Sequence, residues 1–443
     1  MSPAPTLILE NRAQLITAFS EAASPPEKRH IGLEIEFFAL DPVTGSPIPH
    51  EGPCGIGALL SQMADRYKWE KDLEGEHVIA LRRDGESVTL EPGGQVELSS
   101  APRKTLTELD EDQERFCNEL RSVAQELGFR VLATGCQPFA TIASSPWMPK
   151  RRYTVMREVL SQTGQLGHHM MKGTAAVQTS LDYSDEADVT QIFRITHQLA
   201  PIAVALFGAS PIAQGKETGA LSHRSLIWLD TDPHRCGAVP GALEGSLDFS
   251  SYTEYCLDVP MFFILRDGHY LPTRGLTFDR FLREGFEGHQ ATWSDWDLQL
   301  STIFPHARMK SFIEIRSADG QTPQRALAVS AFWCGLIYDA TARNVAVEIS
   351  DYLSTLDHLS LYRDAAIQGL HAQAGKESLA QITSTLLQAS RDGLSRIYPE
   401  EARYLDPICE LVLERNMTPA QEQLEIWRTA ENRLNALLDA YGI

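Results

Sequence analysis

Carboxylates placed inside apolar strands constrain this chain more than any other feature of its sequence. Residues 32–38 read GLEIEFF, and the period-two alternation of a strand puts Glu34 and Glu36 on one face, roughly 7 Å apart, with apolar side chains on the other. Two like charges on one face of a core strand are unfavourable unless cations neutralise them. The strand therefore either turns this face to solvent or lies against positive charge.

Two further segments repeat the pattern. Residues 90–98, LEPGGQVEL, place Glu97 among apolar neighbours, and the Pro-Gly-Gly within them forms a plain turn or lets the backbone approach something closely. In residues 312–320, FIEIRSADG, Glu314 and Arg316 share a face, as a surface ion pair would. Three such strands together predict one cavity that holds hard divalent cations. Oxygen-only ligation suits Mg²⁺, which commonly bridges to substrate phosphates, so the pattern indicates Mg²⁺ and a nucleotide without naming a reaction.

Positively charged and amide side chains lie near these segments. Arg224 stands at the start of a predicted strand, and Arg308 and Lys310 precede the Glu314 segment. Arginine suits bidentate capture of carboxylate or phosphate, and lysine serves as a point charge. Gln178 offers a neutral donor and acceptor on another predicted strand. Taken singly, each of these residues also fits an ordinary surface or core position.

Familiar catalytic motifs are missing from the sequence. It contains no G-x-x-x-x-G-K-[ST], no G-x-G-x-x-G after a strand, no H-E-x-x-H and no G-x-S-x-G. We therefore expect neither a common phosphate-binding loop nor a nucleophile elbow in this protein.

The charge balance narrows the classes of partner. The 443 residues include 39 Lys and Arg against 59 Asp and Glu, a formal net charge of −20. Such a surface repels phosphate backbones and anionic lipid heads, so we expect no nucleic acid and no membrane among the partners. An anionic substrate would need a local positive site or a bound cation.

Cysteine usage and the first residues suggest a compartment. The seven cysteines are scattered without a C-x-x-C, which indicates reduced thiols in a cytosolic protein. Residues 1–5, MSPAP, lack the basic and apolar regions of a secretory signal, and the apolar stretch 199–213 is too short and too broken by proline to span a bilayer. We expect a cytoplasmic location.

The order of elements predicts the fold class. Strands and helices alternate without the even βαβ rhythm of a doubly wound sheet, which favours an α+β fold with an antiparallel sheet backed by helices and a helical C-terminal third. A capping box at Thr105 and Glu108 opens one helix, which Gly128 ends. We expect one domain over residues 1–443, with helices at 11–22, 56–67, 105–128, 186–207, 324–346, 376–395, 401–415 and 418–440, and strands at 30–40, 87–100, 129–135, 175–183, 225–229, 260–266 and 310–316.

Long motifs in this chain resemble the glutamate–cysteine ligases of the plant and proteobacterial type, over nearly the whole chain from about residue 30. They are GLEIEFF, SVTLEPGGQVELSSAP, MMKGTAAVQTSLDYSDEADVTQIFRITHQLAPIAVALFGASP, LSHRSLIWLDTD and MKSFIEIRSADG. The resemblance implies a glutamine-synthetase-like fold, in which a curved antiparallel sheet forms a funnel with helices outside. It also implies a reaction in which ATP phosphorylates the side-chain carboxylate of glutamate and the amine of cysteine attacks the acyl phosphate.

The resemblance implies ATP and Mg²⁺ as cofactors, and it implies a role for each residue of this chain that matches a functional position of the family motifs. The four implied Mg²⁺ ligands are Glu34, Glu36, Glu97 and Glu314. Arg224 would hold the α-carboxylate of glutamate, with Gln178 in the metal-proximal strand. Arg316 and Lys310 would act on the phosphates, with Arg308 as a further nucleotide contact. The partners would be small molecules, namely glutamate and cysteine or another amine, acting on a monomer or homodimer.

Departures from the family pattern fall around the substrate pockets. Ile35 and Phe37 replace a His and a Lys, Gly173 beside Lys172 replaces an Arg, and Ser180 replaces an Asn. Lys172 and Ser180 are therefore further candidates for the substrate pocket. The departures leave open a ligase of the same chemistry that uses another amine. A non-catalytic binding protein on the same fold and a Mg²⁺-dependent hydrolase or phosphotransferase also fit the sequence.

Overall fold

The protein is built on one nine-stranded antiparallel sheet. The computed structural model describes residues 7–443, so the prediction about residues 1–5 lies outside the described part. In spatial order the strands are β14 (Ala307–Met309), β15 (Ile313–Asp319), β7 (Ala176–Leu181), β1 (Ile31–Leu40), β5 (Gln95–Ser99), β4 (Glu86–Leu90), β3 (His77–Arg83) and β2 (Glu70–Glu74), and β6 (Arg130–Leu132) pairs with the end of β1. The predicted antiparallel sheet backed by helices is confirmed.

Strand β1 is the hub of this sheet, because it pairs with β5, β6 and β7. The register sets Glu36 directly opposite Glu97 on β5, and Glu34 directly opposite Gln178 on β7. Leu33, Ile35 and Phe37 point to the other face and are buried in the main hydrophobic core. Like charges directly opposite each other destabilise a sheet, so this register requires compensation from elsewhere.

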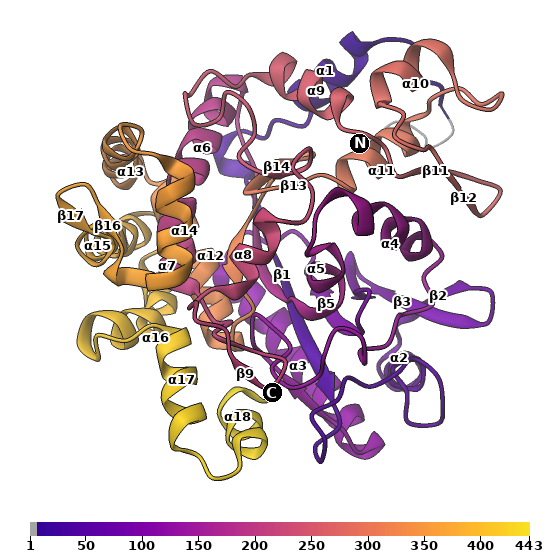
Figure 1. The fold of residues 1–443 in the computed structure, drawn as a ribbon. Coiled ribbons are helices and arrows are strands. Elements are labelled where there is room, and N and C mark those ends of the chain that lie inside the picture. The colour runs from indigo at the N-terminus through magenta and orange to yellow at the C-terminus, as the bar shows by residue number, and fades with distance from the viewer. Residues whose placement is uncertain (1–6) are drawn as a thin grey trace.

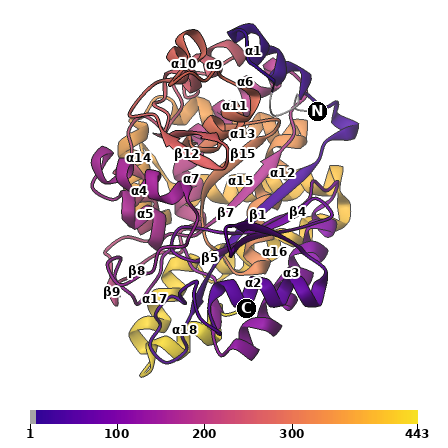
Figure 2. The same ribbon diagram turned by 90° about the vertical axis from the view of Figure 1, so that its right-hand side faces the viewer.

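Helices cover the apolar face. Helix α3 (Leu106–Leu127) begins at the predicted capping box, in which Thr105 and Glu108 bond to each other's backbone N–H groups, and it ends at Gly128 with φ +84°. Helix α12 (Pro323–Tyr338) is buried along nearly its whole length and packs on β1 and β7. Helices α13 (Ala340–Leu353), α15 (Leu379–Ile397) and α16 (Asp406–Cys409) pack against it, at the left of Figure 1 and behind the sheet in Figure 2.

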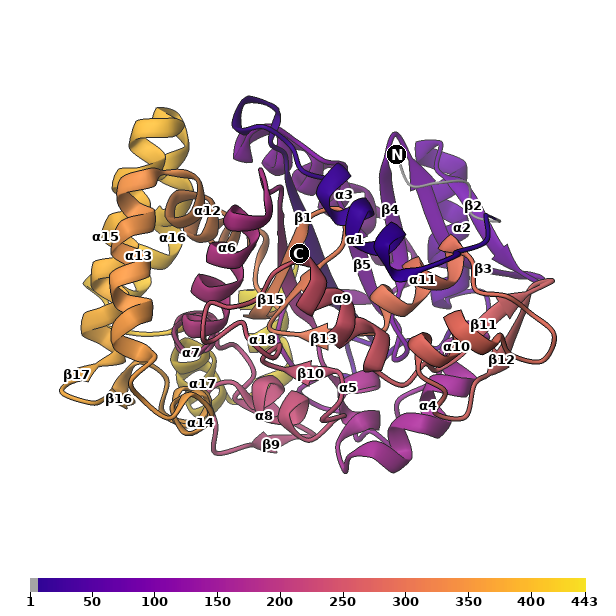
Figure 3. The same cartoon turned by 90° about the horizontal axis from the view of Figure 1, so that it is seen from above.

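The opposite face of the sheet is polar and is covered by short helices and loops. Figure 3 shows α3 on one side of β1 and β5, and α4 (Arg152–Thr163), α5 (Gly167–Gly173) and α8 (His223–Leu229) on the other. The remaining helices are α1 (Arg12–Glu21), α2 (Ile56–Tyr67), α6 (Glu186–Gln198), α7 (Ala200–Phe207), α9 (Phe249–Asp258), α10 (Phe278–Glu284), α11 (Trp293–Ser301), α14 (His358–Gln368), α17 (Pro419–Thr429) and α18 (Arg433–Tyr441). Four two-stranded ribbons pair β8 (Ile212–Ala213) with β9 (Lys216–Glu217), β10 (Cys236–Gly237) with β13 (Phe304–Pro305), β11 (Phe263–Arg266) with β12 (His269–Pro272), and β16 (Gln373–Ala374) with β17 (Glu377–Ser378).

Several predicted elements are corrected by the structure. The predicted strand 225–229 is wrong, because these residues belong to helix α8, whose N-cap hydroxyl is that of Ser222. A short apolar run does not by itself distinguish a strand from a buried helix. Strand 87–100 is a hairpin of β4 and β5. Helix 186–207 is interrupted at Leu199, after which α7 begins at Ala200 with Pro201 in its first turn.

The long helices predicted near the C-terminus are also interrupted. Helix 324–346 divides at Asp339, which ends α12 and caps α13 through its side chain. Residues 399–414 form short 3₁₀, α and π turns in place of one helix. Strands β2 and β3 were not predicted. Charged residues hide the alternation of β2, EKDLE, whereas the apolar run that opens β3, HVIALRR, was a signal that the sequence offered.

Candidate active site

A cavity of about 270 Å³ lies on the polar face of the sheet, under α4, α5 and α8. Its charged and amide lining side chains are Glu34, Glu36, Glu91, Gln95, Glu97, Lys150, Arg152, Gln178, Arg224, Arg308, Lys310 and Arg316. Eight of the predicted site residues are among them. The cavity therefore combines the separate carboxylate segments of the sequence into one site.

The acidic side of the cavity is formed by β1 and β5. Glu36 accepts a hydrogen bond from the backbone N–H of Ala176 at 3.1 Å, and the Ser99 hydroxyl donates to Glu97 at 3.0 Å. These neutral donors leave most of the carboxylate lone pairs without a cationic partner. The carboxylates of β1 and β5 present oxygen atoms, the type of ligand that hard divalent cations prefer.

Burial and mutual repulsion act on these carboxyl groups. Burial, together with the charge of Glu91, raises the pKa of Glu36 to about 8. Burial and the neighbouring Glu34 raise the pKa of Glu97 well above its usual value. The pKa of Glu34 is raised by burial and by Glu314. In the absence of added positive charge, this side of the cavity disfavours ionised carboxylates.

The basic side of the cavity is organised around Glu314, whose side chain is fully buried and is not on the cavity lining. Arg308 lies 2.6 Å, Arg316 2.7 Å and Lys310 3.1 Å from its carboxylate oxygens. Burial alone would raise the pKa of Glu314, but the three cations lower it well below its usual value. Arg316 also donates to Gln178 on the adjacent strand. Both oxygens of Glu314 are thus engaged by cations.

Helix α8 contributes a second arginine position and an aromatic wall. One Nη of Arg224 donates to the carbonyl of Arg316 at 3.2 Å, and the other lies 3.7 Å from Asp319. The guanidinium groups of Arg224 and Arg316 lie 5.8 and 5.9 Å from the ring of Trp228. The indole N–H of Trp228 is buried without a partner. Ser222 holds the helix start by capping Ser225 and donating to Asp319 at 2.9 Å.

Three charged residues of the cavity were missed by sequence reasoning. Glu91 directly precedes the Pro-Gly-Gly turn, and Lys150 and Arg152 belong to a basic run, PKRR, just before and at the start of α4. Burial and the charge of Arg152 lower the pKa of Lys150 to about 8. The Nε atom of Arg152 is buried without a partner. The basic run was a visible signal, but nothing in its spacing connects it to the strands.

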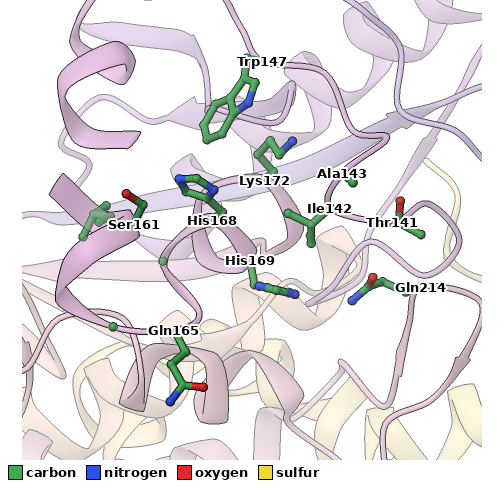
Figure 4. Close-up of a pocket in the computed structure, with 13 residues that line it drawn as sticks. Thr141, Ile142, Ala143, Trp147, Ser161, Gln165, His168, His169, Lys172 and Gln214 are labelled. Atoms are coloured by element: carbon green, nitrogen blue, oxygen red, sulfur yellow. The ribbon is translucent and has the colours of Figure 1, made fainter. Parts of the chain in front are cut away.

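Two predicted substrate residues lie off the cavity lining. Lys172 lines a neighbouring pocket of about 760 Å³, where its ammonium donates to the carbonyl of Ser145 at 2.8 Å and lies 4.7 Å from the ring of Trp147 (Figure 4). Ser180 lies opposite Glu314 in the pairing of β7 with β15 and packs close to Gly32. Their substrate roles stay predictions.

The fold is shared with solved structures of known activity. A glutamate–cysteine ligase from Francisella tularensis, solved in complex with AMP, superposes with a TM-score of 0.55 at 14% identity and covers 93% of this chain and 87% of that one. A bifunctional glutathione synthetase from Pasteurella multocida also gives a TM-score of 0.55, at 13% identity over 97% of this chain and 53% of that one. The architecture is thus that of the glutamate–cysteine ligase class of folds.

Sequence comparison gives the family. The model of glutamate-cysteine ligase family 2 matches residues 30–436. Chloroplastic glutamate–cysteine ligases are 37% identical in Brassica juncea and 36% in Arabidopsis thaliana, over 94% of this chain and 81% and 80% of theirs. The B isoform of Oryza sativa subsp. japonica is 35% identical over 95% of this chain and 85% of its own. The chain belongs to glutamate-cysteine ligase family 2, and the resemblance in its motifs is confirmed.

The same relatives correct the predicted location. They are named chloroplastic, which contradicts the cytoplasmic prediction. That prediction relied on cysteine usage and on the lack of secretory-signal features in residues 1–5. Cysteine usage reports whether a compartment is reducing, and neither argument distinguishes one reducing compartment from another. Within residues 7–443, no helix combines the length and hydropathy that crossing a bilayer requires.

Proposed function

We propose that this protein is an ATP-dependent ligase that joins the γ-carboxylate of glutamate to the amine of cysteine. One observation carries the proposal, namely that the cavity has an uncompensated acidic side and a cationic side facing it. Phosphoryl transfer to a carboxylate brings several negative charges together, so catalysis consists mainly of positioning and charge neutralisation. Because strands and helices from residues 31 to 316 line this one cavity, we assign the whole chain to a single catalytic domain.

The donors on the acidic side fit Mg²⁺. Glu34, Glu36 and Glu97 would hold it, and Glu91 lies close enough to add its charge to the site. When bound, Mg²⁺ neutralises the charge of the transferring phosphoryl group. Glu314 becomes available as a fourth ligand only if the surrounding cations turn toward the nucleotide, so its ligand role stays a prediction.

The cationic side would bind the anionic parts of the substrates. Arg316, Lys310 and Arg308 all line the cavity and contact Glu314. Arg316 and Lys310 would exchange part of that contact for nucleotide phosphates, with Arg308 as a further nucleotide contact. Arg224 lines the cavity, and its guanidinium offers more N–H groups than its contacts with the Arg316 carbonyl and Asp319 use, so it would take the α-carboxylate of glutamate. The partnerless indole N–H of Trp228 would add one neutral donor beside it.

The reaction then needs no protein nucleophile. The γ-carboxylate of glutamate attacks the terminal phosphorus of ATP, ADP leaves, and the amine nitrogen attacks the resulting acyl phosphate and displaces phosphate.

ADP release tests the proposal directly. Purified protein is supplied with ATP, Mg²⁺ and glutamate, and a panel of amino acids including cysteine is added one at a time. We expect fast ADP release with cysteine and formation of γ-glutamylcysteine by mass spectrometry. Fast release with another amine alone would assign a different acceptor to the same chemistry. No release with any amine would overturn the proposal.

A further inference from the structure

A second cluster of possible metal ligands lies outside the active cavity. His50 and Glu51 precede α2, and His77 begins β3. One ligand atom from each of the three side chains lies within 4.8 Å of the other two. The Nδ1 atoms of His50 and His77 lie 3.1 and 3.3 Å from the same oxygen, Oε1 of Glu51. None of the three residues lines the active cavity.

The hydrogen bonding of His50 directs one of its ring nitrogens toward Glu51. Its imidazole is buried, and Nε2 lies 3.0 Å from the carbonyl oxygen of Val78. A carbonyl only accepts, so Nε2 carries the hydrogen and Nδ1 of the neutral ring presents a lone pair. That lone pair faces the carboxylate of Glu51, which also only accepts. The contact is repulsive until a proton or a metal ion lies between the two atoms.

The distances suit a transition metal ion. Ligand atoms about 2.0–2.1 Å from a tetrahedral Zn²⁺ are about 3.3 Å apart, which matches both contacts to Glu51. A histidine that binds metal usually donates its second ring N–H to a carbonyl or carboxylate, as His50 does to Val78. The ring is seated against Gly57, where an added Cβ would lie 2.8 Å from its Cε1 atom.

We propose that His50, Glu51 and His77 form a binding site for Zn²⁺ or a similar imidazole-preferring divalent ion, with solvent in the remaining position. Imidazole nitrogen favours such ions over Mg²⁺, so this site is chemically distinct from the oxygen-only cavity. Half-exposed His77 and exposed Glu51 leave the remaining position open to solvent. The site is independent of the proposed ligase activity.

Its place in the fold gives the site a structural role. The ion would connect the loop before α2 to the hairpin of β2 and β3. The same hairpin carries Glu74, which accepts the backbone N–H of Arg151 at 2.7 Å. Arg151 lies between Lys150 and Arg152, two residues of the active-cavity wall. Occupancy would therefore hold the outer strands against the segment that closes one side of the active cavity.

Metal titration of the full-length protein tests this site. Chelator-treated protein is titrated with ZnCl₂ by calorimetry in excess Mg²⁺, which occupies oxygen-only sites, and Co²⁺ absorption reports tetrahedral coordination. Wild type should bind one tight equivalent. His77→Asn and Glu51→Gln should each weaken that equivalent by about 100-fold or more. Because Glu51 is exposed and His77 is half-exposed, circular dichroism should show an unchanged fold in both variants.

Two control variants separate this site from other ligands. Cys54→Ser removes an exposed thiol from the same loop, and His269→Asn removes an exposed imidazole on β12. Both should keep wild-type zinc binding. Equal binding by wild type and His77→Asn, loss of the tight equivalent in Cys54→Ser, or no tight equivalent in the wild type would each overturn the proposal.

Discussion

Glutamates in two parts of one sheet have opposite electrostatic surroundings. Glu34, Glu36 and Glu97 face one another on β1 and β5, and burial and repulsion raise their pKa values. Glu314, two strands from β1, is surrounded by three cations that lower its pKa. The first group is incomplete without an added cation, whereas the second is complete within the protein. Burial alone therefore does not distinguish the two kinds of carboxylate, whereas the presence or absence of a cationic partner does.

Removing a carboxylate from the incomplete group should give the largest effect on turnover. We expect Glu97→Gln to lower kcat by about 1000-fold, because charge neutralisation at the phosphoryl group is lost. Its stability should equal or exceed that of the wild type, since a buried repulsion is relieved. Steady-state ADP release and urea unfolding measure the two quantities, with exposed Glu76→Gln as the control. Near-normal Mg²⁺-dependent turnover would remove Glu97 from the site.

Replacing Glu314, the carboxylate whose charge the protein already compensates, should instead lower the free energy of unfolding. Glu314→Gln leaves Arg308, Arg316 and Lys310 without their counter-ion, and we expect a loss of about 3–5 kcal/mol in the free energy of unfolding. The matched control is Glu217→Gln, which breaks the exposed pair with Arg428 and should cost less than about 1 kcal/mol. If urea unfolding showed the same loss of free energy for Glu314→Gln and Glu217→Gln, Glu314 would not have the charge compensation that distinguishes it from the glutamates of β1 and β5.

The role of Arg224 on the cationic side of the cavity can be tested through the KM for the substrate glutamate. Arg224→Ala should raise the KM for glutamate by about 10- to 100-fold, because a charge-assisted hydrogen bond is worth about 1.5–3 kcal/mol. The KM for ATP should change little. Exposed Arg82→Ala serves as the control. A glutamate response like that of the wild type would exclude Arg224 as the carboxylate ligand.

Two buried histidines, His197 and His306, have no ionic partner and give a third electrostatic case. Their effect on stability is the smallest that we expect. Burial lowers the pKa of His197 to about 3 and that of His306 well below 6.5. As the pH falls below 6.5, both imidazoles are protonated in the unfolded chain but stay neutral in the folded protein. Their contribution to the free energy of unfolding is therefore complete above pH 6.5 and is lost as the pH falls toward the folded-state pKa values. The loss should reach about 1.4 kcal/mol per pH unit for each histidine.

Unfolding measured between pH 7 and pH 5 tests this slope. His306→Phe, which keeps a ring against Tyr362, should remove about one proton from the pH dependence, and exposed His269→Asn should remove none. An unchanged slope in His306→Phe would show that this imidazole is not held neutral.

The sequence predicted the strands that carry the carboxylates, because alternation fixes which face each side chain takes. It predicted the faces of Glu34, Glu36 and Glu314 and the capping box of α3, all of which depend on neighbours within a few residues. It also indicated that the carboxylate segments share one cavity. The antiparallel arrangement followed from the uneven spacing of the elements.

Other features depended on contacts distant in the sequence. Nothing local shows that Lys150 and Arg152 approach β5, or that Lys172 turns to a neighbouring pocket. Alternation also does not reveal that Glu314 is saturated by cations while Glu97 is not, since both sit in strands of similar pattern. The helix α8 was misjudged because its apolar run is shorter than the lengths that separate helices from strands.

The central position of β1 restricts how this protein can change over evolutionary time. The strand pairs with neighbours along both of its edges, and its alternate side chains serve the core and the active cavity. An insertion or deletion of a single residue before Glu34 would exchange the two faces, sending carboxylates into the core and aliphatic side chains into the cavity. The strand can therefore vary by substitution but not in length, and new specificities must arise in the loops and helices that cover it.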